Sequence, residues 1–176
     1  TTISKMTVND AMGNQSTVDY FYEDGHYYFN SSYNREMAGF RVVTKTDGLG
    51  YKTKTYYHQD ENSVADTSAG EFNDHISKKG MPYRTESYDN QNRLIKATVN
   101  KIDKQDLGNG RFFPYLKQTV NIDYNPSSGL NKAVAQNYEN DEFGNQISVT
   151  DYGEVRLSSN DGQFSDIGND LIKQQN

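Results

Sequence analysis

Short runs with a period of two dominate the sequence and constrain its fold more than any other feature. In each run every second residue is β-branched or aromatic, so these side chains share one face of an extended strand. Val18, Tyr20 and Tyr22 alternate in this way, and similar spacing recurs within 40–46, 51–57, 95–99, 120–124, 134–138 and 147–149. Gly, Asn and Asp separate the runs, which predicts antiparallel strands joined by tight turns.

The connections between several runs share one turn pattern. Four turns in which an Asp stands three residues before a Gly or an Asn are each followed by a strand-like run. The pairs are Asp10 and Gly13, Asp47 and Gly50, Asp89 and Asn92, and Asp141 and Gly144. Asp at the first position of a type I turn accepts a hydrogen bond from the backbone two residues on. Gly and Asn tolerate the positive φ of the fourth position, so the pattern predicts hairpin loops that end in a bulge.

These signals predict an all-β fold, an antiparallel meander of long hairpins that forms a curved, partly open sheet with little helix. Only 33% of the 176 residues are hydrophobic, but 14 Tyr and 8 Phe argue against disorder. Tyrosine suits a sheet that has one solvated face. We expect the sheet to span residues 1–155, with an exposed loop at about 60–80. Residues 156–176 read as a polar tail that is frayed or forms a short helix.

Composition excludes several functional classes. The net charge is −6 and no basic stripe is present, which disfavours nucleic acid as a partner. No apolar run approaches the roughly 20 residues that a membrane span requires. The absence of Cys excludes disulfides and thiolate metal sites. The chain begins at Thr1 without an initiator Met or a signal peptide, as expected of a fragment of a longer protein.

Several motifs resemble those of a known toxin family. The turn "YDNQNRL" resembles the tyrosine-aspartate (YD, or Rhs) repeat, with Asn92 in place of the usual Gly. Five segments in order, 20–43, 53–60, 79–89, 110–120 and 138–155, are similar to the middle region of the insecticidal toxin complex B component (TcdB/SpvB-like proteins). The resemblance covers about residues 1–155 and departs from the family pattern within 29–38.

The resemblance implies a non-catalytic structural segment of a large exported bacterial toxin. In that family a YD-rich region winds a long β-sheet into a hollow shell around a toxic C-terminal domain, and the enzymatic activity lies in a separate domain. The resemblance implies a secreted or cell-surface location. It also implies flanking β segments of the same chain, and other toxin-complex components, as partners. Exposed sheet edges would permit edge-to-edge self-association.

Two alternatives from other functional classes stay open. A glycan- or surface-binding β module would use exposed aromatic rings. The candidate rings are Tyr20, Tyr22, Tyr27, Tyr28, Tyr56 and Tyr57. A hydrolase would need a carboxylate pair, or an acid–base couple of His58 and Asp60, which point the same way on a strand. Cross-strand packing of the rings and a hydrogen-bonded His at a strand end are the favoured interpretations.

The sequence predicts no cofactor and singles out no metal site. His26, His58 and His75 are too far apart in sequence to form a local metal motif. Calcium stays open, because "QDENSVAD" (59–66) and "NDEFGN" (140–145) supply oxygen ligands close together. Neither segment matches the twelve-residue EF-hand loop.

Overall fold

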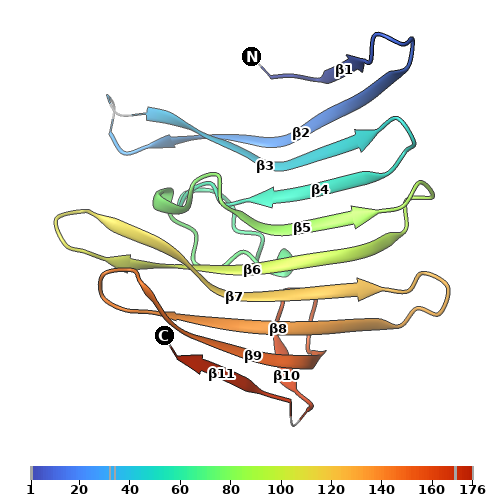
Figure 1. Ribbon diagram of the computed structural model, residues 1–176. Helices are drawn as coiled ribbons and strands as arrows, with labels where there is room; N and C mark the ends of the chain where they lie inside the picture. The colour runs from blue at the N-terminus through green and yellow to red at the C-terminus, as the bar shows by residue number, and fades with distance from the viewer. Residues whose placement is uncertain (1, 32, 34, 169, 176) are drawn as a thin grey trace.

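Eleven strands form one antiparallel sheet in which strands that are consecutive in sequence lie side by side (Figure 1). The computed structural model describes residues 2–31, 33, 35–168 and 170–175. The strands are β1 (Lys5–Asn9), β2 (Gln15–Phe29), β3 (Arg35–Asp47), β4 (Lys52–Tyr57), β5 (Pro82–Tyr88), β6 (Leu94–Asp106), β7 (Phe112–Tyr124), β8 (Asn131–Asn140), β9 (Gln146–Leu157), β10 (Phe164–Asp166) and β11 (Ile172–Gln175). The order runs from β1 to β10 without a crossover, and β11 pairs with β9. The predicted all-β meander is confirmed.

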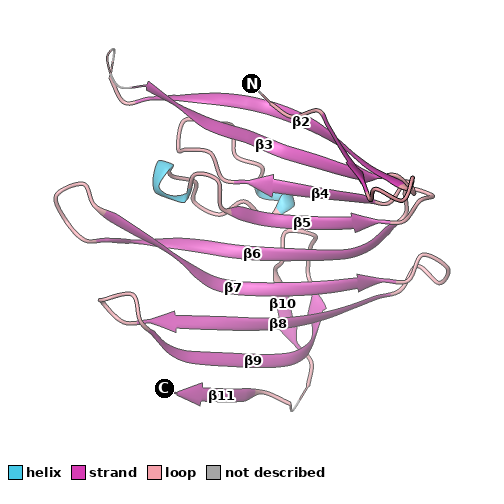
Figure 2. Cartoon of the chain, turned by 45° about the horizontal axis from the view of Figure 1, so that its top comes forward, coloured by secondary structure: helices cyan, strands magenta, loops and turns pink. Residues whose placement is uncertain are grey.

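The sheet is curved and open rather than closed into a barrel (Figure 2). β1 pairs with β2 alone among the described strands, and all five residues of β1 are exposed. The described residues contain two short 3-10 helices, η1 (Thr67–Ala69) and η2 (Ile76–Lys78), both between β4 and β5. No helix of the described chain has the length and the apolar character that crossing a membrane requires.

The four Asp residues of the turn pattern each bond to the backbone of their own turn. The Asp47 carboxylate accepts hydrogen bonds from the N–H groups of Leu49 and Tyr51, at 2.9 and 3.0 Å. Asp10, Asp89 and Asp141 accept equivalent pairs. The φ angles at the fourth positions are positive: Gly13 91°, Gly50 87°, Asn92 62° and Gly144 87°. These contacts define the hairpins and hence the register of the strands that follow.

The apolar core is thin and lies on one face of strands β6 to β9. Val99 lies opposite Val120, which in turn lies opposite Ala135. The buried members of the core are Ala97, Val99, Val120, Ile122, Ala133, Ala135 and Val155. Small and β-branched side chains dominate this set, which leaves room for other segments to approach the sheet closely.

Two segments cover this face of the sheet, the β4–β5 connection (residues 58–81) and the β9–β10 turn (residues 158–163). A Cβ placed on Gly70 of the connection would lie 2.7 Å from Val99 Cγ1. A Cβ placed on Gly162 of the turn would lie 2.9 Å from the same atom. Glycine at these positions therefore allows both segments to pack directly on β6.

The structure corrects two expectations about these polar segments. Residues 60–80 are not a wholly exposed loop, because Asp60, Glu71 and Lys78 are buried. Residues 156–176 form no helix within their described part; they continue β9 and then add β10 and β11 to it. In the connection the buried Lys78 bonds to the backbone of the sheet. The C-terminal strands β10 and β11 pair with β9 through their backbones, and most of their side chains stay exposed.

Replacing Gly144 by Val is expected to destabilise the protein by about 2 kcal/mol or more. A β-branched residue tolerates positive φ poorly, and a Cβ at this position would lie 2.6 Å from the Phe113 ring. Thermal unfolding followed by circular dichroism measures the effect. Gly13→Val is the matched control, since a Cβ there meets nothing within 4 Å. Equal losses for the two variants would show that contact with Phe113 adds nothing to the backbone strain.

Candidate functional site

The β4–β5 connection is fixed to the sheet by a buried lysine. Lys78 is 0% exposed, and its Nζ donates hydrogen bonds to the carbonyl oxygens of Phe72, Asn73 and Ile102, each at 2.7 Å. Phe72 and Asn73 belong to the connection, whereas Ile102 belongs to β6. Burial lowers the pKa of Lys78 to about 8. The three carbonyl oxygens match the three N–H donors of an ammonium group.

Residues 59 and 60 fix the start of the connection to β2 and β3. Gln59 Nε2 donates to the carbonyl oxygens of Asp24 (2.7 Å) and Gly39 (3.1 Å). The Asp60 carboxylate lies 3.1 Å from His26 Nε2. Asp24 and Gly39 both have positive φ, so the strands are irregular at the point where their carbonyl groups turn toward Gln59.

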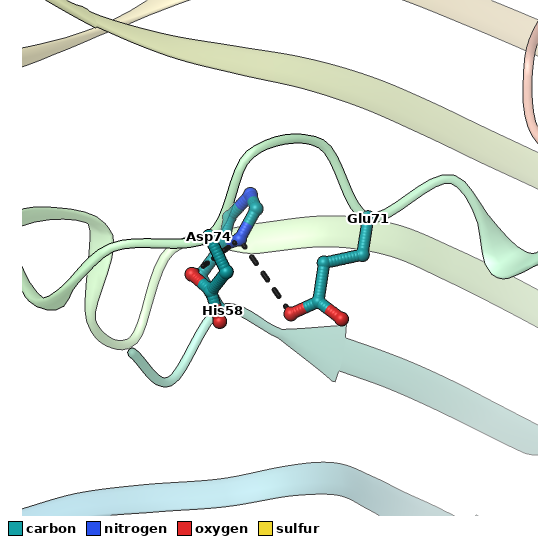
Figure 3. Close-up of side chains that lie close together, drawn as sticks. All are labelled: His58, Glu71 and Asp74. Atoms are coloured by element: carbon teal, nitrogen blue, oxygen red, sulfur yellow. Dashed lines mark hydrogen bonds and ion pairs between the residues drawn. The ribbon is translucent and has the colours of Figure 1, made fainter. Parts of the chain in front are cut away.

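Within the connection, the side chains of His58, Glu71 and Asp74 form a buried cluster (Figure 3). His58 Nδ1 donates to Asp74 Oδ1 at 2.9 Å and lies 3.8 Å from Glu71 Oε1. The His58 side chain is fully buried, and 1% of the Glu71 side chain and 4% of the Asp74 side chain are exposed. Water is therefore largely excluded from two neighbouring carboxyl groups and an imidazole.

The environment drives the two carboxyl pKa values in opposite directions. Burial raises the pKa of Glu71 to about 7, and the Asp74 carboxylate beside it adds to the increase. Burial alone would also raise the pKa of Asp74, but hydrogen bonds from the His58 ring and the Gln59 backbone N–H outweigh it and lower that pKa to about 2. Near neutral pH, Asp74 therefore carries the negative charge while Glu71 holds a proton for part of the time.

The surroundings of the cluster are aromatic and only partly hydrogen-bonded. The Tyr83 ring packs against the His58 ring, with 5.1 Å between centroids. His58 Nε2, Glu71 Oε1 and the Tyr83 hydroxyl are buried and have no hydrogen-bond partner among the described residues. Glu71 also lines a cleft of about 510 Å³ between the connection and the β9–β10 turn, together with Phe72, Lys101 and Phe164.

A second buried polar network joins the β9–β10 turn to β5. Arg84 Nε donates to Glu86 Oε1 at 2.7 Å, and Arg84 Nη1 donates to the carbonyl oxygen of Asn160 at 2.6 Å. Glu86 Oε2 accepts from the hydroxyl groups of Tyr56 and Tyr88. The charged side chains thus connect segments that lie far apart in the sequence.

The structure places His58 and Asp60 with different partners from the couple that the sequence suggested. His58 pairs with Asp74, and Asp60 pairs with His26. β4 ends at Tyr57, so the rule that alternate residues point the same way does not apply to 58–60. Sequence reasoning missed Glu71 and Asp74, because no periodicity or motif links them to His58 within the connection.

The tyrosines considered for glycan binding are mostly half-buried. Tyr22 packs against Phe40 with ring centroids 4.9 Å apart. The hydroxyl groups of Tyr22, Tyr28 and Tyr56 donate to Ile3 O, Glu61 and Glu86. Tyr20 and Tyr57 are half-buried, and Tyr27 is the exposed member of the set, at 56%. These contacts give most of the set a role in cross-strand packing.

Carboxylates of the two segments considered for calcium bond to nearby backbone. Asp60 Oδ1 accepts from Asn62 N, and Asp66 Oδ1 accepts from Ala69 N. Asp141 Oδ1 accepts from Phe143 N and Asn145 N. Their contacts are those of turn-capping residues.

Comparison with known protein families finds no family model that matches this chain, and comparison with curated proteins finds no match either.

Proposed function

We propose that the chain is a non-catalytic structural segment of a large, exported YD-repeat or Rhs-type bacterial toxin, and that it contributes strands to a β-sheet shell around a toxic domain. The observation that supports this proposal most directly is the uninterrupted antiparallel meander, in which four Asp-capped turns join successive strands. A wall of this kind requires reproducible turns and backbone pairing, and both depend on local residues.

The open edges of the sheet support the same proposal. β1 is the first strand of the order, and its exposed residues include Met6 and Val8. An unpaired edge strand is a template for another strand, and apolar residues on it favour such pairing. We infer that flanking β segments of the same toxin chain pair with this sheet. The toxin would be secreted or displayed on the bacterial surface, with other toxin components as further partners.

The buried polar groups have positions that suit a structural role. Lys78 donates hydrogen bonds from the β4–β5 connection to β6, and Gln59 donates to β2 and β3. The Asp60 carboxylate lies 3.1 Å from His26 Nε2 of β2. Buried polar groups that are bonded in this way fix one arrangement of neighbouring segments. The connection and the β9–β10 turn thus stiffen one face of an otherwise thin sheet.

An antibody raised against the chain tests the proposal in cultures of the producing bacterium. We expect immunoblots to detect a polypeptide far larger than 20.0 kDa, in the medium or on intact cells. Electron microscopy of the immunopurified protein should then show a hollow particle. Antibody pre-absorbed with the chain is the control. A single species of about the chain's own mass, confined to the cell interior, would contradict the proposal.

A further inference from the structure

We propose that His58, Glu71 and Asp74 bind one divalent transition-metal ion, with zinc as the best match to the donor set. One donor atom from each residue lies within 4.8 Å of the other two. His58 Nδ1 is 2.9 Å from Asp74 Oδ1 and 3.8 Å from Glu71 Oε1. In a tetrahedral zinc site with bonds of about 2.0–2.1 Å, neighbouring donors are about 3.3 Å apart. Shifts of less than about 1 Å in these two separations would therefore bring both to that value.

An unpaired oxygen of Glu71 is an independent indication that a ligand binds between the three side chains. Its side chain is 1% exposed, and Oε1 has no hydrogen-bond partner among the described residues. Figure 3 shows the Glu71 side chain directed toward the His58 imidazole, where Asp74 also points. An unpaired carboxyl oxygen in a protein interior is costly unless a proton, a hydrogen-bond donor or a cation satisfies it. A cation between the three side chains would meet that need.

The outer oxygens of both carboxylates are already held by backbone groups. Glu71 Oε2 accepts from Asp66 N, and Asp74 Oδ2 accepts from Gln59 N at 3.0 Å. Asp74 Oδ1 also accepts from His75 N at 2.8 Å. Hydrogen bonds of this type orient metal ligands before the ion arrives. The carboxylates therefore present Glu71 Oε1 and Asp74 Oδ1 toward His58.

The chemistry of the donors selects the ion. Calcium and magnesium prefer oxygen ligands alone, whereas an imidazole nitrogen with two carboxylate oxygens suits zinc and its neighbours in the first transition row. Such an ion would join His58, directly after β4, to the middle of the β4–β5 connection. The effect would be to lock the connection in place. This inference does not depend on the proposed toxin function.

Zinc titration of the EDTA-stripped chain tests the site. Calorimetry should show binding of one zinc ion per chain. At a concentration one hundred times the Kd, zinc should raise Tm by roughly 5–10 °C. Cobalt should give the visible absorption bands of a four-coordinate site, while calcium should leave Tm unchanged. Wild-type protein that binds no zinc, or whose Tm zinc leaves unchanged, would overturn the proposal.

Glu71→Gln is the deciding variant, because the amide keeps the shape of the side chain and removes the charged ligand. Its affinity for zinc should fall by roughly a hundredfold, while its circular dichroism spectrum without metal should match that of the wild type. Glu142→Gln is the matched control, since it also removes one carboxylate but lies at an exposed position of the β8–β9 turn, outside the cluster. That variant should bind zinc as the wild type does. Zinc binding that survives Glu71→Gln unchanged would assign the ion to a different site and refute the proposal.

Discussion

Replacing Lys78 by Met is expected to lower the free energy of unfolding by about 3–5 kcal/mol. The substitution leaves the carbonyl oxygens of Phe72, Asn73 and Ile102 without the donor that now binds all three. A buried acceptor that loses its partner costs about 1–3 kcal/mol, and the added apolar contacts of Met offset only part of that sum. For a chain of this length the loss corresponds to a fall in Tm of roughly 6–20 °C.

Urea denaturation and limited proteolysis together locate this effect. The loss should appear as a lower urea midpoint and as faster cleavage within residues 58–81, the segment that Lys78 fixes to β6. Lys79→Met is the matched control, because Lys79 is partly exposed and pairs with Glu36 on the surface at 2.8 Å. Such a pair contributes about 0–1 kcal/mol. Similar losses in the two variants would mean that the three carbonyl contacts of Lys78 do not hold the connection.

The strands and the turns of this fold were predictable because their causes are local. An Asp accepts hydrogen bonds from residues two and four positions on, so residues 47–51 or 141–145 contain the whole turn. Alternation is equally local, since adjacent residues of a strand face opposite sides. The meander then follows, because short turns make each strand the antiparallel neighbour of the one before it.

The folding of the β4–β5 connection and the packing of the β9–β10 turn were not predictable in this way, because their partners are distant in sequence. Lys78 is in "SKKG", a stretch that composition alone would assign to the solvent, yet it is fully buried. The Asn160 carbonyl oxygen that accepts from Arg84 lies 76 residues away from it. Polar residues of this kind are buried only where the fold brings a partner to them, and no local sequence pattern identifies that partner.

The candidate site also combines features that the sequence predicts locally with features that depend on distant partners. The sequence drew attention to His58 and Asp60 because residues two apart on a strand point the same way. It could not assign their partners, since His26, Glu71 and Asp74 reach the pair through tertiary packing. A buried cluster of one imidazole and two carboxyl groups is thus a product of how the connection folds back, and its chemistry becomes visible only in three dimensions.

Metal-free wild-type protein is expected to lose stability as the pH rises from 5 to 8, and Glu71→Gln should not share this loss. Burial raises the pKa of Glu71 from 4.5 in the unfolded chain to about 7 in the folded chain. The folded state therefore binds the Glu71 proton more tightly. Its contribution to stability is complete below pH 4.5 and is lost as the pH rises through 7. The difference between the two pKa values corresponds to about 3 kcal/mol in the free energy of unfolding.

Asp74 acts in the opposite direction and at lower pH. Its folded pKa of about 2 lies below the ordinary value of 3.8, so its contribution is present above pH 3.8 and is lost as the pH falls through 2. The two groups together place the greatest stability of the cluster near pH 4–5. Gln at position 71 stays uncharged at every pH. The variant should therefore lack the fall in stability above pH 5 and keep the fall in stability at low pH.

Urea denaturation at pH 5, 6, 7 and 8 in the presence of EDTA measures the difference between the two proteins. At pH 5 their free energies of unfolding should be similar, and at pH 8 Glu71→Gln should be the more stable by up to about 3 kcal/mol. Other groups that titrate in this interval are common to both proteins and cancel in the comparison. Glu142→Gln, at an exposed position of the β8–β9 turn, controls for the loss of one negative charge and should keep the wild-type profile. Parallel profiles for the wild type and Glu71→Gln would show that Glu71 is already ionised in the folded protein at pH 5, and that a cationic neighbour outweighs its burial.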